Sequence, residues 1–259
     1  MELNFNAASS TSALNRVAES QQQIASGQRI NQASDDPAGI QVVIGLTRDI
    51  NENAAGLKNV LDGTSLTQVA QGGINQITDS VQQLRELSLQ ASNGTLNPSD
   101  REALQSQADQ LLEGIRDTIG QTSFNGQDLL SKEDSINIQA GSDSTEINTP
   151  DLLASLEESG LFSLELGSEE ALTALDDSLD QLNTAAGSFA ASENALDSIG
   201  RSLADSSVNS AEARSRINDA DMAQAVSEQS RAQLQQDVAI TLQAQANASR
   251  GDVLALLGG

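Results

Sequence analysis

Very few side chains in this sequence could do chemistry. Its 259 residues include no His, Cys, Tyr or Trp, which removes the commonest general base and the thiolate nucleophile. Adjacent carboxylates occur at Asp35–Asp36 and Asp176–Asp177, but neighbours on a helix point about 100° apart and cannot share a proton. Helix capping and solvation account for them. We therefore expect no catalytic, metal-binding or cofactor-binding residue, and predict that the protein is not an enzyme.

Three short motifs are weak signals. Arg250–Gly251–Asp252 matches an adhesion tripeptide, and Asn93–Gly94–Thr95 and Asn247–Ala248–Ser249 fit the glycosylation sequon. No segment follows the calcium-loop or phosphate-loop pattern. Because the tripeptide lies in an apolar C-terminal segment, we interpret it as accidental. A helical adhesin that uses it remains one alternative.

The clearest pattern in the sequence is a set of long helices, each with a row of regularly spaced residues along one side, which we call a seam. Spacings of three and four return to one side of a helix every two turns, which is typical of coiled-coil packing. One seam near the N-terminus consists of Leu3, Ala7, Ser10, Leu14, Val17, Gln21 and Ile24. Another consists of Leu172, Leu175, Leu179, Leu182, Ala186, Phe189, Glu193, Leu196, Gly200 and Leu203. A protein of this kind works by assembling with other helices.

Composition and charge narrow the range of folds and partners that the protein can have. Only 2% of the residues are aromatic and 37% are hydrophobic, which suits a long thin bundle better than a thick core. The net charge of −24, with only 13 Lys and Arg residues, argues against a nucleic-acid partner. The longest apolar runs, such as 253–257, are too short to span a bilayer, so we expect no membrane insertion. Residues 1–5 lack the pattern of a cleaved secretory leader.

The acidic residues are unevenly distributed. Residues 143–180 carry eleven of them and no Lys or Arg, whereas residues 1–31 and the last 38 residues are nearly balanced. Nearly neutral ends are what helices need if they pack against many copies of themselves. A generally acidic proteome, as in a high-salt habitat, explains the total charge equally well and the distribution less well.

Start and stop signals divide the chain into helices and one mixed segment. The first helix should end near Gly27, and Asp36 with Pro37 should begin a long helix that runs to Ser92, with a phase change in its seam at Gly72–Gly73. Asn93–Gly94 should form a left-handed cap. Later helices are predicted at 98–120, 169–214 and from 217 onward. Between them, alternation at 136–139 and 161–166 predicts strands around a small helix at 151–158.

The predicted fold is therefore mainly α, a long antiparallel helical bundle or coiled coil with a small β-containing segment. Three parts are expected. Residues 1–36 and 217–259 form terminal coiled-coil helices, residues 37–126 and 168–216 form a helical bundle domain, and residues 127–167 form the small mixed β segment.

Several ordered stretches closely resemble bacterial flagellin. The first is SQQQIASGQRINQASDDPAG at residues 20–39, followed by LRELSLQASNGT at 84–95 and QTSFNG at 121–126. Near the other end, SRINDADMA at 215–223 leads to AQAN at 244–247. The resemblance covers roughly residues 1–130 and 168–259. The short gap between the two halves implies a short form without large outer domains.

The resemblance implies a subunit of the bacterial flagellar filament, a secreted, extracellular helical polymer that serves motility. Flagellins are exported unfolded by the type III apparatus, bound by an export chaperone, and added beneath a cap next to hook-associated proteins. We expect the termini to be disordered in the monomer and to fold into an inner helical tube on assembly. The expected polymerisation residues are Leu3, Leu14, Val17, Ile24, Val226, Leu234, Val238, Leu242, Val253, Leu254 and Leu257.

Two further implications concern partners. In some flagellins the stretch that matches 84–90 is read by Toll-like receptor 5, and this sequence keeps the receptor-facing residues Arg85, Glu86 and Leu87. Gln83 and Gly114, however, stand where the receptor-binding pattern has Arg and Glu, which counts against recognition. The closest rival identity is a hook–filament junction protein, a relative with similar ends.

Overall fold

The computed structural model describes residues 2–257, with the side chains of residues 11–249 and Gly251. Its helices are α1 (Glu2–Ser26), α2 (Pro37–Ala91), α3 (Pro98–Gln121), α4 (Leu152–Glu158), α5 (Glu169–Asn218) and α6 (Met222–Leu257), with a 3₁₀ turn η1 (Leu161–Ser163). The chain divides into a central unit, residues 51–207, and a terminal unit made of residues 1–50 and 208–259. The mainly helical fold class is confirmed.

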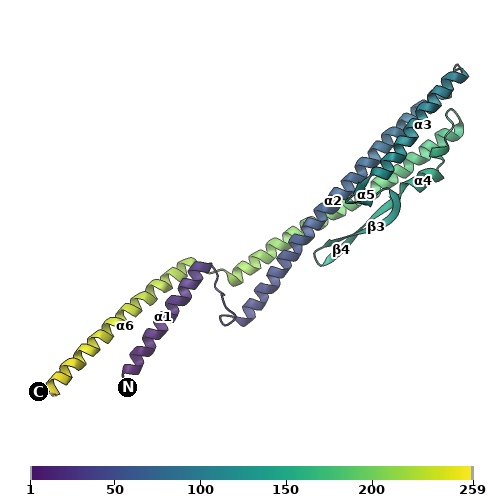
Figure 1. Cartoon of the computed structure of the whole chain (residues 1–259). Coiled ribbons are helices and arrows are strands. Elements are labelled where there is room, and N and C mark those ends of the chain that lie inside the picture. The colour runs from purple at the N-terminus through teal and green to yellow at the C-terminus, as the bar shows by residue number, and fades with distance from the viewer. Residues whose placement is uncertain (1, 258–259) are drawn as a thin grey trace. The chain divides into compact units, whose positions relative to one another are not determined.

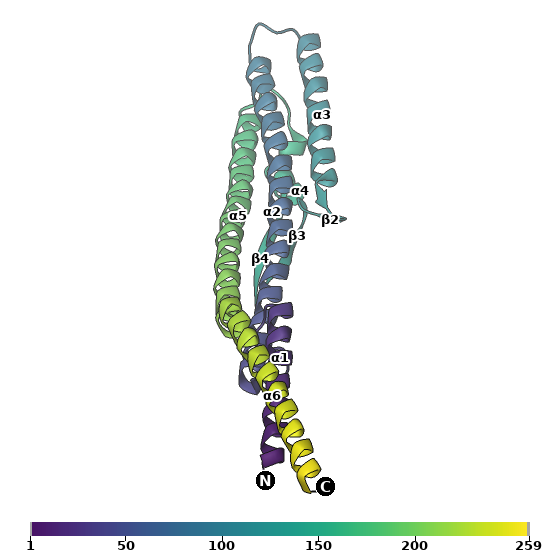
Figure 2. The same ribbon diagram turned by 90° about the vertical axis from the view of Figure 1, so that its left-hand side faces the viewer.

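The central unit is a helical bundle with a hairpin packed on it. Its parts of α2 and α5 run alongside α3, and the strands β3 (Ser131–Ala140) and β4 (Asp143–Asp151) lie against the helices (Figures 1 and 2). One continuous core joins all of these elements. Its fully buried side chains include Ile77 and Leu84 from α2, Ile115 from α3, Ile147 from β4, and Phe189 from α5.

The buried seam of α2 differs from the predicted one. Most of its buried residues form one series at steps of four and three: Gly56, Val60, Gly63, Thr67, Ala70, Ile74, Ile77, Val81, Leu84, Ser88 and Ala91. Leu66 and Leu87 are buried beside this series. The predicted phase change at Gly72–Gly73 is therefore wrong, and in the first part of the helix Ala54 and Leu61 are exposed. The prediction followed large apolar side chains, whereas the first turns of this seam use glycine.

Glycine is required at position 56 by a close approach of backbones. A Cβ atom placed there would lie 2.2 Å from the backbone nitrogen of Gly141 and 2.9 Å from the carbonyl carbon of Ala140. These two residues lie at the tip of the β3–β4 hairpin, and Asn59 Nδ2 donates a hydrogen bond of 2.9 Å to the carbonyl of Gln139. The absence of a side chain thus allows the hairpin to rest directly on α2.

Helix α5 packs against its neighbours through the residues that its heptad spacing predicted. Every residue of the expected series from Leu172 to Leu203 is buried or half-buried. The polar member, Glu193, accepts hydrogen bonds of 3.1 Å from Gln68 Nε2 and from Gln71 Nε2 on α2. A polar residue at such a position favours one register between two helices over alternatives.

The mixed segment contains two antiparallel hairpins. Strands β1 (Ser123–Phe124) and β2 (Gln127–Asp128) enclose Asn125 and Gly126, which both have positive φ, as a two-residue hairpin turn requires. Strands β3 (Ser131–Ala140) and β4 (Asp143–Asp151) pair Ile136 with Ile147. Alternation at 136–139 therefore predicted a strand correctly, and α4 confirms the small helix.

Three local predictions were wrong. Residues 161–166 form a 3₁₀ turn and loop, because Leu161 and Leu164 both point into the core at a spacing of three. Asn93 and Gly94 have no positive φ, and Asn93 Oδ1 instead accepts from Thr95 N at 3.1 Å. The last helix begins at Met222, because Asp221 Oδ1 accepts from Ala223 N and Gln224 N and so caps it there.

Candidate assembly surface

The adjacent carboxylates serve as caps and surface ion pairs. Asp35 Oδ2 accepts from the backbone nitrogens of Asn31 and Gln32 at 3.0 and 2.9 Å, and Asp36 Oδ1 accepts from Gly39 N at 2.8 Å. Asp176 Oδ1 lies 3.0 Å from Arg85 Nε. Across the described part of the chain, no three His, Cys, Asp or Glu side chains gather as metal ligands would.

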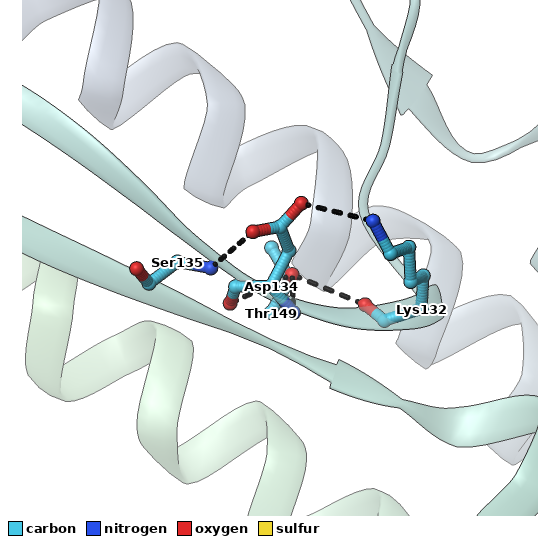
Figure 3. Close-up of polar contacts among 4 residues, drawn as sticks. All are labelled: Lys132, Asp134, Ser135 and Thr149. Carbon is cyan, nitrogen blue, oxygen red and sulfur yellow. Dashed lines mark hydrogen bonds and ion pairs between the residues drawn. The ribbon is translucent and has the colours of Figure 1, made fainter.

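The carboxylate with a shifted pKa is also structural. A hydrogen bond from Ser135 N, and then the nearby Lys132 ammonium, lower the pKa of Asp134 below its ordinary value of 3.8. Figure 3 shows both contacts beside Thr149, whose Oγ1 accepts from Asp134 N at 3.1 Å. These bonds close an irregularity in the β3–β4 ladder between Ser131 and Asp134. They stabilise a bulged strand and leave no base poised beside a nucleophile.

The pairing of α1 with α6 in the terminal unit offers a more informative surface (Figures 1 and 2). The two helices meet through small side chains, of which Ala13, Ser20, Ala225 and Ala232 are at most 4% exposed. In each helix these positions are seven residues apart, so they form a heptad seam. Half-buried Val17 and Ile24 continue the α1 side of this seam.

Such a seam stabilises the pair only weakly. A buried methyl contributes about 0.8 kcal/mol, whereas fixing the backbone of each residue costs about 1–2 kcal/mol. The hydroxyl of Ser20 is satisfied within its own helix, donating to the carbonyl of Arg16 at 2.8 Å. The small residues bring the two helices close together without burying much apolar surface.

Several large apolar side chains of the pair are exposed. Leu234, Val238 and Leu242 are 66%, 56% and 50% exposed and recur every four residues along α6. We call these three residues the α6 stripe. At about 100° per residue Leu234 lies on the side of the helix opposite Ala225 and Ala232, and Val238 and Leu242 follow it at steps of about 40° around the helix. An apolar row on the outer side of a helix pair is typical of a surface that packs against another chain.

Hydrogen bonds from Ala220 to Gly27 and from Arg29 to Ile217, which we call the clip, join the end of α1 to the chain between α5 and α6. Gly27, with a φ of +70°, ends α1, and its carbonyl accepts from Ala220 N at 3.0 Å. Arg29 donates from Nε and Nη2 to the carbonyl of Ile217 at 3.1 and 2.7 Å, which satisfies an open carbonyl at the end of α5. Arg29 also lies 3.6 Å from Asp36, the cap of α2. One guanidinium therefore links the termini of two helices.

The structure distributes the expected polymerisation residues over two surfaces. Val17 and Ile24 lie in the α1–α6 seam, whereas Leu14, Val226 and the α6 stripe are exposed. Leu14 and Gln21 were expected within the seam, and they are exposed because Ala13 and Ser20 occupy it instead. The side chains of Leu3, Val253, Leu254 and Leu257 lie outside those that the structure describes.

The three residues expected to face a receptor do not share one environment. Leu87 is buried at 8% exposure in the bundle core, so only Arg85 and Glu86 lie on the surface. Arg85 is held by its ion pair with Asp176.

Sequence reasoning missed the small seam residues and the clip. Ala13 and Ser20, and likewise Ala225 and Ala232, are small residues seven apart, which was a readable signal. The role of Arg29 had no such signal, because its partner Ile217 is 188 residues away and offers only a backbone carbonyl. Over the residues that the structure describes, no helix combines the length and hydrophobicity needed to cross a membrane.

Comparisons with known proteins agree with this architecture. The family model of the bacterial flagellin N-terminal helical region matches residues 2–135, and that of the C-terminal helical region matches residues 172–257. Phase 1 flagellin of Salmonella naestved and flagellin of Salmonella dublin are each 39% identical over 131 residues, which cover 51% of this chain and 26% of theirs. The matched part thus spans about a quarter of the length of these relatives.

Two solved structures share the fold. A crystal structure of Bacillus cereus flagellin aligns with a TM-score of 0.50 at 24% identity, covering 56% of this chain and 88% of that one. A putative flagellar hook-associated protein from Vibrio parahaemolyticus aligns with a TM-score of 0.61 at 15% identity, covering 71% of this chain and 100% of that one.

Proposed function

This chain belongs to the bacterial flagellin family, and from that membership we propose that it is a structural subunit that polymerises into the flagellar filament. In this proposal residues 1–36 and 217–259 form the filament core, residues 37–126 and 168–216 form the surrounding bundle, and residues 127–167 form a small outer segment. The work of the protein is mechanical, so it needs no catalytic group.

The observation that carries the proposal is the allocation of side chains in the α1–α6 pair. Small residues occupy the buried positions of the seam within the chain, and the residues of the α6 stripe are at least half exposed. A lone molecule gains little from holding large apolar side chains in water. Neighbouring copies would bury them, and each fully buried Leu or Val contributes about 1.5–3 kcal/mol.

We propose further that α1 and α6 become ordered only on assembly and then form an inner helical tube. Their small seam supports this, because an isolated pair of helices with so little buried apolar area is marginal. The test is amide hydrogen exchange. Residues 11–26 and 222–249 should exchange quickly in the monomer and slowly in assembled material. Strong protection of these residues in the monomer would overturn this part of the proposal.

The filament proposal is tested by replacing the α6 stripe with Leu234→Ser, Val238→Ser and Leu242→Ser in one variant. The unmodified chain should form long filaments that sediment and are visible by electron microscopy. The variant should stay monomeric, with its central unit as helical and as stable as before. A matched control replaces three exposed glutamines of α6, Gln233, Gln243 and Gln245, with Ser. Filament growth by the stripe variant would refute the proposed role of these residues.

A hook–filament junction protein is the alternative. The likeness to the hook-associated protein from Vibrio is one of fold at 15% identity, whereas both flagellin family models match this chain. The match favours the filament subunit. Electron microscopy of the purified chain separates the two, because a junction protein would not grow into long filaments.

The remaining partners follow from the same proposal. The chain would be secreted through the flagellar export apparatus, bound by an export chaperone, and added beneath a cap to an extracellular filament that begins at hook-associated proteins. Recognition by Toll-like receptor 5 is not expected, because Leu87 is buried in the core and Gln83 and Gly114 stand where the receptor-binding pattern has Arg and Glu. Tight binding of the monomer to the receptor ectodomain would contradict this expectation.

A further inference from the structure

Charged side chains are scarce on the terminal helices, and they gather at one place. Between residues 3 and 26 the sequence has only Arg16 and Glu19, and between 222 and 249 it has only Glu228, Arg231 and Asp237. Four of these five, all except Asp237, line one groove of about 300 Å³ on the α1–α6 pair. We call Arg16, Glu19, Glu228 and Arg231 the charged quartet. Its net charge is zero in a chain whose formal net charge is −24.

The charged side chains of the quartet do not form ion pairs with one another within the chain. Among the described residues no ion pair joins any two of its members, and all four side chains are exposed. Glu228 Oε1 accepts only a neutral hydrogen bond, 3.0 Å from Gln224 Nε2. The other residues that line the groove, Ser20, Gln23, Ala232 and Gln235, are uncharged. The groove therefore presents two cations and two anions on a pair of helices that carries few other charges.

We propose that this groove is a contact between copies of the chain, in which the arginines of one quartet meet the glutamates of another copy's quartet. The proposal rests on the proposed function and adds what sets the register between subunits. A surface with equal numbers of both signs can face another copy of itself without net repulsion, whereas an acidic surface cannot. Paired charges also penalise shifted contacts, because a displaced quartet brings like charges together.

The occupant follows from the charge balance. A basic partner would use only the two glutamates and would leave Arg16 and Arg231 facing cations. An acidic partner would pair only with the two arginines and would leave Glu19 and Glu228 facing anions. A second copy satisfies both signs. The competing explanation is that the quartet pairs within the molecule, Arg16 with Glu228 and Glu19 with Arg231, across the contact between α1 and α6.

A charge-swap experiment separates these explanations. The acidic variant carries Arg16→Glu and Arg231→Glu, and the basic variant carries Glu19→Arg and Glu228→Arg. In each variant all four charges have the same sign on both helices, so neither can pair its quartet within one molecule or with its own copies. A mixture of the two variants can pair only between molecules. A control with the same change in net charge, Lys58→Glu with Arg101→Glu, alters exposed residues of the central unit.

The readout is the concentration above which filaments sediment, measured at low and at physiological salt. Either variant alone should raise it by about tenfold or more at low salt, and an equimolar mixture should return it to near that of the unmodified chain. Circular dichroism checks that each variant keeps its folded central unit.

Three outcomes overturn the proposal. The first is that either variant alone assembles like the unmodified chain. The second is that both fail alone and the mixture fails too, which is what pairing within the molecule predicts. The third is that the control fails as the acidic variant does, which assigns the effect to net charge. Failure of the unmodified chain to assemble would instead remove the proposed function, and this proposal with it.

Discussion

Replacing Gly56 by alanine should destabilise the central unit, and the same replacement at Gly72 should stabilise it. Both residues lie inside α2, so both changes gain about 1 kcal/mol of helix propensity. They differ only in surroundings. A Cβ atom at position 72 meets no atom within 4 Å, whereas at position 56 it would lie 2.2 Å from Gly141 N and 2.9 Å from Ala140 C.

The magnitude at Gly56 follows from what must move. The obstructing atoms are backbone, so no side-chain rotation relieves the contact, and the hairpin must shift away from α2. That shift also stretches the hydrogen bond from Asn59 to the carbonyl of Gln139. Overpacking costs about 1–3 kcal/mol, and the upper part of that range is expected here. After the gain in propensity, the net loss is about 1–2 kcal/mol.

Thermal unfolding followed by circular dichroism measures the contrast. For a unit of this size about 1 kcal/mol corresponds to 2–4 °C, so Gly72→Ala should raise the midpoint by about that much. Gly56→Ala should lower it by a similar or larger amount. Equal midpoints for the two variants would show that the hairpin does not rest on α2 as described, and would refute the reasoning.

Two further predictions concern the clip and the bulged strand. Arg29→Ala removes two hydrogen bonds to Ile217 O from a half-exposed guanidinium, at a cost of about 1–2 kcal/mol. Arg29→Lys should lose most of the same stability because lysine lacks the two forked N–H donors of the guanidinium. Faster amide exchange at Asn218 and Ala220 measures both effects, and a lysine variant that exchanges like the unmodified chain would contradict the role given to Arg29. Asp134→Asn should lower stability at neutral pH. Because the folded-state pKa of Asp134 is below its ordinary value of 3.8, its stabilisation is present above that value and is lost as pH falls through the lowered one. Urea unfolding at several pH values should show the difference vanish in acid, and a difference that persists there would count against it.

The sequence predicted most of the fold because most of it is repetitive. The heptads of α5, the capping signal at Asp36 with Pro37, and the alternation at 136–139 are local patterns, and each formed the expected element. The clip could not be predicted in this way. Its main contact joins Arg29 to a backbone carbonyl far away in the chain, and backbone carbonyls carry no sequence signature.

The errors about which residues are buried share one physical cause, which is the weight given to large apolar residues. In the first part of α2 the large residue Leu61 is exposed, and Gly56 and Gly63 face the core, because close approach is worth more there than side-chain volume. Residues 161–166 alternate in sequence, yet Leu161 and Leu164 anchor a turn whose period is three. Size alone therefore does not decide which side of an element is buried.

The same distinction separates the two kinds of heptad in this chain. In α5 the large residues Leu182, Phe189 and Leu196 fill the seam at steps of seven, so the chain completes that contact by itself. In α1 and α6 the fully buried seam positions are alanine and serine, Val17 and Ile24 are only half-buried, and Leu234, Val238 and Leu242 are exposed. A seam of large residues makes a stable domain by itself. The proposed assembly adds that a pair of helices with small residues inside and large residues outside gains most of its stability from neighbouring copies. On that proposal, the order of residue sizes around a heptad predicts which helices fold within the chain and which fold against other copies.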